Sequence, residues 1–287
     1  MDKNLIISNS YNKAIEEGFN LYLEEKAAAE NSEIKIDEEA LIADIERKWL
    51  VTGLLELDGM TPVEFINSLS SLDELFEFFL SIASASDVGV PDILIEKFKY
   101  YGGKAASDKL FDYVDNSLSS KDKNPDDIYP AVSQSVYAIG CLQEEEYKQK
   151  LINLLIENKQ EEMISEAICA AIVAYGVSIL DDVINAFGTT QDQTTKEHFL
   201  VCVAEICNEN MYKSDEVFYF MKNAFRTVSN LNLIVEILGD YGDSRAIPLL
   251  RGYVLKNIGK IDSATFNQMR AIIKKLGGDI EDLIYTK

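Results

Sequence analysis

The sequence predicts an all-α protein in which pairs of helices stack on one another as a solenoid. Three observations lead to this prediction. Runs that alternate apolar and polar residues, as half-buried strands do, are few. Amphipathic stripes with helical spacing occur almost everywhere along the chain. Breaks between these segments recur every 32 to 36 residues, at Gly140, Gly176, Asn208, Gly242 and Gly277, and such a period is typical of stacked helical repeats.

Composition and charge limit the classes of partner. The chain has 287 residues, of which 47% are hydrophobic, and this is enough to bury a sizeable core. Its formal net charge of -22 repels nucleic-acid phosphates and anionic membrane surfaces, so we expect neither as a partner. The acidity belongs to residues 1 to 228, because residues 229 to 287 carry 7 acidic and 8 basic side chains. Such acidity ordinarily provides solubility, and it also attracts a positively charged partner.

The sequence is most simply that of a cytoplasmic protein. Its first residues, MDKNLIISNSYNKAIEEGF, lack the basic flank and apolar run of a signal peptide, and no stretch approaches the roughly 20 apolar residues that span a bilayer. The four cysteines are Cys141, Cys169, Cys202 and Cys207. They show no C-x-x-C spacing and lie in apolar helical segments, so we expect reduced core thiols.

Residues 1 to 118 are predicted as an irregular helical region that lacks the regular period. The stretch LDGMTPVEF contains a capping box, with Thr61 as N-cap, Pro62 at the first helical position and Glu64 at the third. The next two apolar segments are predicted as a pair of buried helices, and the glycine pair at 102 and 103 is expected to end the second of them.

The polar segment 119 to 130, SSKDKNPDDIYP, is predicted as a linker because it carries two prolines and no apolar period. Residues 131 to 287 then form the repeat solenoid. The alternative is one continuous solenoid whose early repeats have lost their pattern. The sequence leaves both arrangements open.

Each repeat unit combines a first helix rich in small and branched apolar residues, a Gly or Asn suited to a left-handed helix end, and a second helix introduced by Ser or Asp. In one unit the stripe of the first helix is Ile164, Ile168, Ala171, Ile172 and Tyr175, and that of the second is Leu180, Val183, Ile184 and Phe187. A unit of this size cannot bury both stripes alone, so neighbouring units must stack.

One unit resembles a HEAT-like repeat. In LGDYGDSRAIPLLRGYVLKN, residues 238 to 257, a Gly-Asp turn precedes Arg-Ala-Ile-Pro at the opening of the second helix, which Asp243 is expected to cap. Residues 170 to 187 are a looser copy, and the unit with the polar turn NENMYKSD departs from the pattern. The resemblance covers residues 129 to 287 and implies a right-handed superhelix. The two glycines of the turn follow a helix and not a strand, which excludes a phosphate-binding loop.

Candidate catalytic residues are scarce. Nucleophilic triads and most metal sites use His, and the chain has only His198, which is adjacent to Glu197. Some HEAT-like proteins are di-iron hydroxylases, but these use several His-Glu pairs. Acidic runs such as residues 144 to 146 fall in first helical turns, where negative charge complements the helix dipole. We therefore expect no catalytic residue, no metal and no cofactor.

With catalytic and metal sites not expected, the remaining candidate for a functional feature is a surface that recognises another molecule. In stacked helix pairs the second helix of each unit usually lines the concave face, so its polar positions beside the core stripe are predicted to contact a partner. These positions are Tyr147, Lys148, Asp181, Asp182, Asn185, Tyr219, Lys222, Asn223 and Arg251. Aromatic residues and an arginine among carboxylates suit a protein or peptide interface.

The sequence thus favours a non-catalytic scaffold or adaptor whose acidic concave surface binds a protein or peptide, with a basic partner as one option. The alternative is a metal-dependent carboxylate enzyme on the same scaffold. Its only support in the sequence is the abundance of Asp and Glu. A third option is a subunit that joins larger assemblies through an apolar patch on FEFFL or FKYYGG. Neither the partner's identity nor the oligomeric state follows from the sequence.

Overall fold

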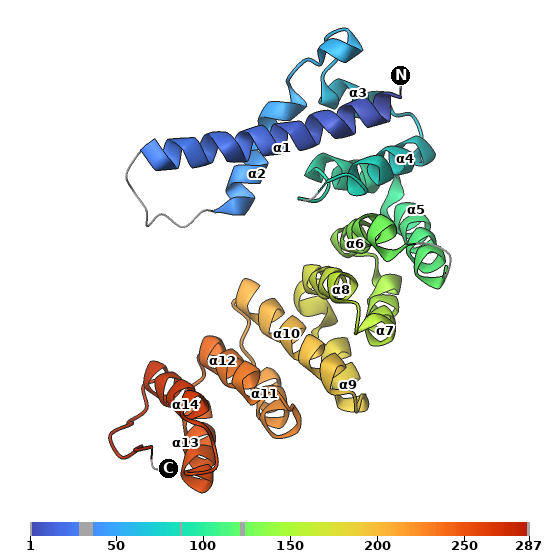
Figure 1. The fold of residues 1–287 in the computed structure, drawn as a ribbon. Helices are drawn as coiled ribbons and strands as arrows, with labels where there is room; N and C mark the ends of the chain where they lie inside the picture. Colours follow the sequence, from blue (N-terminus) through green and yellow to red (C-terminus); the bar gives the residue numbers. More distant parts are fainter. Residues whose placement is uncertain (1, 29–36, 87, 121–123, 286–287) are drawn as a thin grey trace. The chain divides into compact units, whose positions relative to one another are not determined.

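The computed structural model describes residues 2–28, 37–86, 88–120 and 124–285. In these ranges the chain forms fourteen α-helices and three short 3-10 helices without a strand, which confirms the all-α prediction (Figure 1). The chain divides into two compact units, Met1–Glu144 and Glu145–Lys287, which we call the N-terminal unit and the C-terminal unit.

The N-terminal unit is built from long helices around an aromatic core. Its helices are α1 (Lys3–Ala28), α2 (Glu38–Leu50), η1 (Leu55–Leu57), α3 (Pro62–Ser68), α4 (Leu72–Ala83), α5 (Asp92–Ser119) and α6 (Pro125–Leu142). Helix α1 packs against α2 and α4, and α5 packs against α4 and α6. Edge-to-face ring pairs join Phe65 to Phe78 and Phe79 to Phe98. In FEFFL, Phe78 and Phe79 are fully buried and Phe76 and Leu80 are half-buried, whereas in FKYYGG Tyr100 is 79% exposed.

The predicted capping box at the start of α3 is confirmed. The Thr61 hydroxyl accepts a hydrogen bond from the Glu64 backbone N–H at 3.3 Å, and the Glu64 carboxylate accepts one from the Thr61 N–H at 2.8 Å. Two backbone donors that the helix cannot satisfy are thereby paired. Pro62 occupies the first helical position, where a backbone N–H would have no partner within the helix, so its absence costs no hydrogen bond.

Helix α5 is interrupted at Gly102, whose φ of 109° and ψ of 106° lie outside the helical region. A Cβ atom at this position would meet nothing within 4 Å, so the backbone angles, and not crowding, favour glycine. The sequence predicts that the glycine pair ends the helix. The helix does break at Gly102, but it resumes at once and continues to Ser119.

The second half of the predicted linker is helical. Helix α6 begins at Pro125, so residues 125 to 130 form its first turns, while residues 121 to 123 lie outside the described ranges. The predicted break at Gly140 is wrong, because Gly140 is buried inside α6. The helix ends instead with Gln143 in the left-handed conformation, at φ 55° and ψ 32°. Helix α6 belongs to the N-terminal unit, because the boundary between the two units lies after Glu144.

The C-terminal unit consists of two layers of helices. Its elements are η2 (Glu145–Tyr147), α7 (Lys148–Asn158), α8 (Glu162–Ala174), η3 (Gly176–Ile179), α9 (Leu180–Thr189), α10 (Gln193–Glu209), α11 (Asp215–Thr227), α12 (Leu231–Tyr241), α13 (Ala246–Asn257) and α14 (Ser263–Lys275). Helices α8, α10, α12 and α14 contact one another in sequence and form one layer, which we call the even layer (Figure 1).

The other helices of this unit, α7, α9, α11 and α13, form the odd layer. Helix α7 packs against α9, the Phe187 and Phe220 rings join α9 to α11, and the Phe225 and Tyr253 rings join α11 to α13. Among the described residues no single helix is long and apolar enough to cross a membrane. Of the helices described, only α8 and the following segment η3–α9, taken as a pair, have the required length and apolar composition. The chain bends by 109° between them.

Side-chain contacts in the C-terminal unit link residues about one repeat apart. The Gln193 side chain accepts a hydrogen bond from the Ser229 backbone N–H, 36 residues later. Thr265 donates to Asn232 across 33 residues, and Lys275 forms an ion pair with Asp240 across 35. These separations match the period read from the sequence. These contacts join the start of α10 to the residues before α12, and α12 to α14.

Three of the predicted helix breaks in this unit have the expected conformation. Gly176, Gly242 and Gly277 have φ values of 59°, 72° and 89° in the left-handed region, which favours glycine. The prediction for Asn208 is wrong, because α10 runs through it to Glu209. Chain reversal occurs later in the long polar turn, where Met211 has a φ of 47°.

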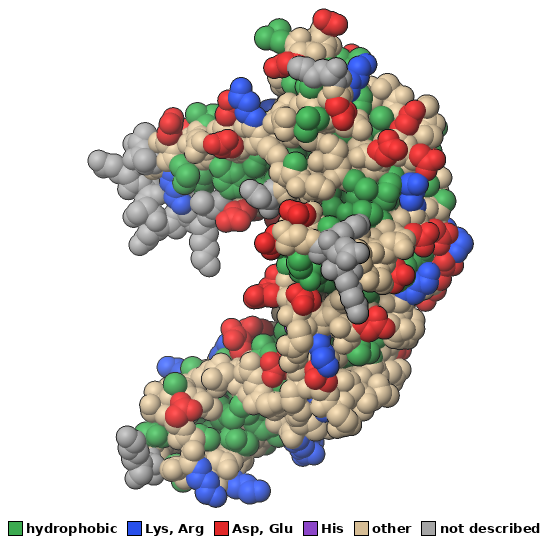
Figure 2. All heavy atoms as spheres, turned by 45° about the vertical axis from the view of Figure 1, so that its right-hand side comes forward, with side chains coloured by type: hydrophobic (Ala, Val, Ile, Leu, Met, Phe, Trp, Pro, Cys, Tyr) green, Lys and Arg blue, Asp and Glu red, His purple; other side chains and the backbone are tan. Residues whose placement is uncertain are grey.

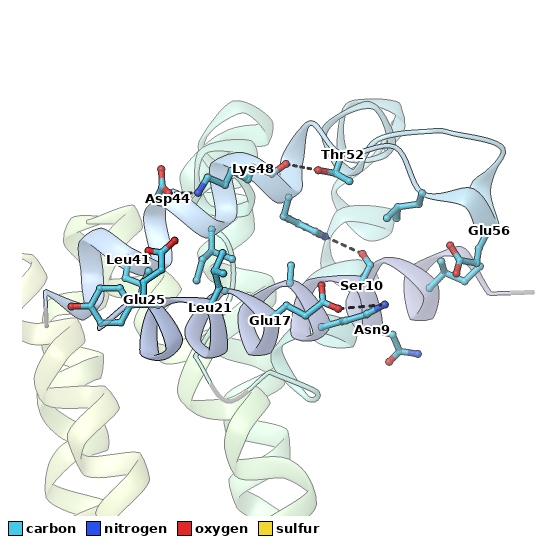
Figure 3. Close-up of a pocket in the computed structure, with 18 residues that line it drawn as sticks. Asn9, Ser10, Glu17, Leu21, Glu25, Leu41, Asp44, Lys48, Thr52 and Glu56 are labelled. Carbon is cyan, nitrogen blue, oxygen red and sulfur yellow. Dashed lines mark hydrogen bonds and ion pairs between the residues drawn. The ribbon is translucent and has the colours of Figure 1, made fainter. Parts of the chain in front are cut away.

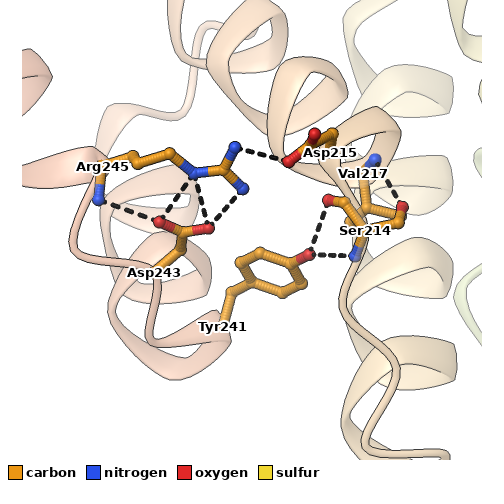
Figure 4. A network of polar contacts seen from close by, with 6 residues as sticks. All are labelled: Ser214, Asp215, Val217, Tyr241, Asp243 and Arg245. Carbon is orange, nitrogen blue, oxygen red and sulfur yellow. Dashed lines mark hydrogen bonds and ion pairs between the residues drawn. The ribbon is translucent and has the colours of Figure 1, made fainter.

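The turn between α12 and α13 is held by a polar network (Figure 4). Asp243 does not cap α13 as predicted, because its carboxylate accepts a hydrogen bond from the Arg245 backbone N–H at 2.9 Å, before the helix begins. The Arg245 guanidinium donates to both Asp243 and Asp215, and it stacks 4.2 Å from the Phe218 ring centroid. Tyr241 donates to the Ser214 carbonyl oxygen. The network thus joins this turn to the start of α11.

Candidate protein-binding surfaces

The nine residues predicted to bind a partner all belong to the odd layer or to the η2 turn that precedes it. Two of them are not surface residues. Tyr147 is fully buried, and the Lys150 ammonium lies 4.1 Å from its ring centroid. Lys148 is 7% exposed, and its Nζ donates to the Ser178 carbonyl oxygen and to the Glu145 carboxylate. Lys148 thereby fastens the start of α7 to η3, and the burial of both side chains corrects the expectation that they are exposed.

The three candidates on α9 are exposed. Asp181 and Asp182 lie in the first helical turn and Asn185 follows one turn later. Within the described part of the chain, neither aspartate forms an ion pair. Acidic side chains are favoured in the first turn of a helix, where they complement the helix dipole.

The three candidates on α11 lie on one face, because their spacing is i, i+3 and i+4. Tyr219 is 60% exposed, Asn223 is exposed, and Lys222 is partly exposed with its Nζ 5.9 Å from the Tyr219 ring centroid. Helices α9 and α11 are neighbours through the Phe187 and Phe220 rings. We call Asp181, Asp182, Asn185, Tyr219, Lys222 and Asn223 the α9–α11 surface.

The remaining candidate, Arg251, is engaged within the protein. Its guanidinium forms an ion pair with Asp282 at 2.7 Å and donates to the Asp279 carbonyl oxygen. This pairing lowers the pKa of Asp282 below its ordinary value. Only 25% of the arginine side chain is exposed. Arg251 therefore ties the C-terminal residues to α13, as Arg245 ties a turn to α11.

The even layer carries carboxylates that the sequence analysis did not single out. Partial burial raises the pKa of Glu205 in α10, and repulsion by Glu209 one turn away raises it further. The only His, His198, lies on the same helix, and partial burial lowers its pKa although nearby carboxylates oppose this shift. In the face shown in Figure 2, acidic side chains are widespread and several Lys and Arg side chains lie near the C-terminal end. This agrees with the uneven charge of the sequence.

A groove in the N-terminal unit was also missed by the sequence analysis (Figure 3). It lies between α1 and α2, continues to Leu54 and Glu56, and encloses about 830 Å³. On α1 its lining residues recur every three or four positions from Ile6 to Glu25, and Leu21 is the most exposed apolar residue among them, at 56%. The periodicity of α1 could have indicated a contact face. The pairing of α1 with α2 is a tertiary contact that local periodicity does not encode.

Glycine at position 18 allows a close approach of α1 and α2. A Cβ atom on Gly18 would lie 2.4 Å from the Ile45 side chain, so glycine lets the two helices meet there. Trp49 lines the groove with only 3% of its surface exposed, and its indole N–H donates to the Ser10 hydroxyl at 3.0 Å. The groove therefore has a fixed aromatic floor.

Polar contacts beside the groove hold its walls together. Tyr11, whose ring centroid is 4.9 Å from that of Trp49, donates to the Glu46 carboxylate at 2.7 Å. Burial is the main cause that raises the pKa of Glu46, and burial also raises the pKa of the Tyr11 hydroxyl. This partly buried hydrogen bond joins α1 to α2.

Ion pairs occupy the middle of the groove rim and leave its ends acidic. Lys13 pairs with Glu17 at 3.6 Å, and Lys48 pairs with Asp44 at 2.7 Å. Glu25 and Glu56 lie at opposite ends of the groove in Figure 3. Among the described residues, no cation pairs with either of them.

In the described ranges, no group of three or more His, Cys, Asp or Glu side chains is arranged to hold a metal ion. Comparisons of the chain with protein-family models, with curated proteins and with solved structures each give no match. The HEAT-like resemblance consequently rests on the residues quoted from the sequence.

Proposed function

We propose that the protein is a non-catalytic scaffold that binds a protein or peptide, and that its partner is basic. The observation that carries this proposal is the α9–α11 surface. On α9, Asp181 and Asp182 are exposed and form no ion pair among the described residues, and the neighbouring helix α11 exposes Tyr219 and Asn223. A basic side chain would pair with Asp181 or Asp182, and Tyr219 would supply a large contact area at a small entropic cost.

The arrangement of the C-terminal unit supports a scaffold. Stacked helical units form extended surfaces on which neighbouring helices present residues side by side. We further propose that these units form a right-handed superhelix of the HEAT-like kind, since the two layers and the repeat-spaced contacts are what such a fold requires. A cytoplasmic location is also proposed, because Cys169, Cys202 and Cys207 are buried free thiols.

Charge reversal on the α9–α11 surface tests the proposed function. Immobilised wild-type protein is expected to retain basic proteins from a cell lysate at low ionic strength and to release them near 1 M salt, where the Debye length is about 3 Å. The double variant D181K/D182K should retain them at least about tenfold less, because attraction becomes repulsion. Quantitative mass spectrometry of the eluates measures this difference.

The matched control is E161K/E162K, which changes the same charge at the start of α8, where both glutamates are also exposed. It should retain the partner as the wild type does. If both double variants retained equally less of the basic proteins, net charge alone would explain the loss. The α9–α11 surface would then not be the binding site. Recovery of only neutral or acidic proteins would contradict a basic partner.

A further inference from the structure

We propose that the groove between α1 and α2 binds an amphipathic helix of a partner protein, with apolar residues along one side and Lys or Arg near both ends. This inference is independent of the α9–α11 surface, because the groove lies entirely within the N-terminal unit.

The shape of the groove fits a helix. Its α1 wall runs from Ile6 to Glu25, which corresponds to about 28 Å along a helix axis. The other wall is α2, whose lining residues Leu41, Ile45 and Trp49 recur at helical spacing. Two helices side by side leave a trough between their ridges, and a third helix fills such a trough by packing its own ridge into it.

The lining of the groove requires an apolar contact face. Leu21 is largely exposed, and Leu41, Leu54 and Tyr22 are each partly exposed along the same trough. Covering these side chains with a partner's Leu or Ile residues removes apolar surface from water, which favours binding. Trp49 is buried beside them, and its hydrogen bond to Ser10 fixes its position.

Charge at the groove ends selects the occupant. Glu25 and Glu56 mark the two ends, and a helix that carries a cation at each end would pair with both. A second copy of this chain is a poor occupant, because each copy has a formal net charge of -22 and the copies repel each other. The groove therefore favours a basic partner helix over self-association.

The test uses a synthetic helical peptide of about 20 residues, roughly 30 Å long, with a Leu stripe and two Lys at each end. Trp49 is the only tryptophan of the chain and lines the groove, so its fluorescence reports occupancy directly. The full-length protein is titrated with the peptide at low ionic strength. We expect saturable binding with a shift of the Trp49 emission. A peptide of the same composition with its Leu residues scattered should bind at least about tenfold more weakly.

Two pairs of variants locate the contact. Leu21→Glu, in the groove, should weaken binding by about tenfold or more, because a charge is placed against an apolar face. Leu23→Glu is its control, since Leu23 is 53% exposed on the same helix but does not line the groove. E25K/E56K should weaken binding by about tenfold, whereas Glu24→Lys, beside the groove, should change it less than about twofold.

The outcomes separate this inference from the proposed function. D181K/D182K should bind the peptide as the wild type does, since those residues lie in the other unit. No saturable binding, or equal binding by Leu21→Glu and the wild type, overturns the inference. A wild-type dimer that Leu21→Glu dissociates also overturns it, because a second copy would then occupy the groove. Circular dichroism of each variant establishes that its helices are intact.

Discussion

Asp192 combines three interactions in one carboxylate at the start of α10. It accepts hydrogen bonds from the backbone N–H and the hydroxyl of Thr195, both at 2.9 Å, and it pairs with Lys159 at 2.9 Å. These contacts favour the ionised form and lower the pKa of Asp192 from 3.8 to about 2, the Thr195 N–H being the largest cause. The same side chain therefore caps α10 and fastens it to the end of α7, and the ion pair with Lys159 requires the negative charge.

Asp192→Asn should make the stability of the C-terminal unit less dependent on pH. A lowered pKa in the folded state means that Asp192 stabilises the protein fully above the unfolded value, and that this contribution disappears as the pH falls towards about 2. Asparagine keeps the cap but loses the ion pair. Urea midpoints followed by circular dichroism should differ between variant and wild type at pH 7 and converge near pH 2. An equal difference at both pH values would contradict this assignment.

The elements show that glycine has different tasks in different helices. Gly102 breaks α5 through its backbone angles, whereas Gly252 lies in the regular interior of α13 with open space where a Cβ would be. Gly239, buried in α12, has a third task, since a Cβ there would lie 2.5 Å from the Ile272 side chain of α14. Glycine thus allows α5 to break at Gly102 and allows α12 and α14 to approach at Gly239. At Gly252 it only makes the helix less stable than alanine would.

Alanine substitution should distinguish the first two of these tasks. Gly102→Ala forces a side chain onto backbone angles that only glycine adopts easily, so it should destabilise the N-terminal unit by about 1–3 kcal/mol. Gly252→Ala should instead stabilise the C-terminal unit by up to about 1 kcal/mol, because alanine is the better helix former. Urea unfolding measures both. If Gly102→Ala proves neutral, the break in α5 is not maintained by glycine.

Helices and their spacing could be predicted from the sequence because amphipathic stripes and left-handed glycines are local signals. Gly176, Gly242 and Gly277 were identified in this way. Gly140 and Asn208 misled the prediction, since glycine also occurs in buried helical positions and asparagine is tolerated on exposed helix surfaces. The burial of Tyr147 and Lys148 and the α1–α2 groove depend on which helices pair in three dimensions, and a single sequence does not specify such pairing.

At the scale of the whole molecule, each of the two units has fully buried hydrophobic residues of its own. Fully buried residues such as Leu75 and Phe98 belong to the N-terminal unit, and Leu238 and Met269 belong to the C-terminal unit. A unit with its own core is able to unfold as a cooperative entity. The proposed binding surfaces are divided in the same way, with the groove on one unit and the α9–α11 surface on the other.

Two observables should therefore report different unfolding events. Trp49 fluorescence follows the N-terminal unit alone, whereas circular dichroism follows the helices of both units. Leu238→Ala opens a cavity in the C-terminal core and should destabilise that unit by about 2–5 kcal/mol. In urea it should lower the midpoint of part of the circular dichroism signal and leave the Trp49 transition unchanged, while Leu75→Ala should move the Trp49 transition. A Trp49 midpoint that falls equally in both variants would mean that the chain unfolds as one cooperative body.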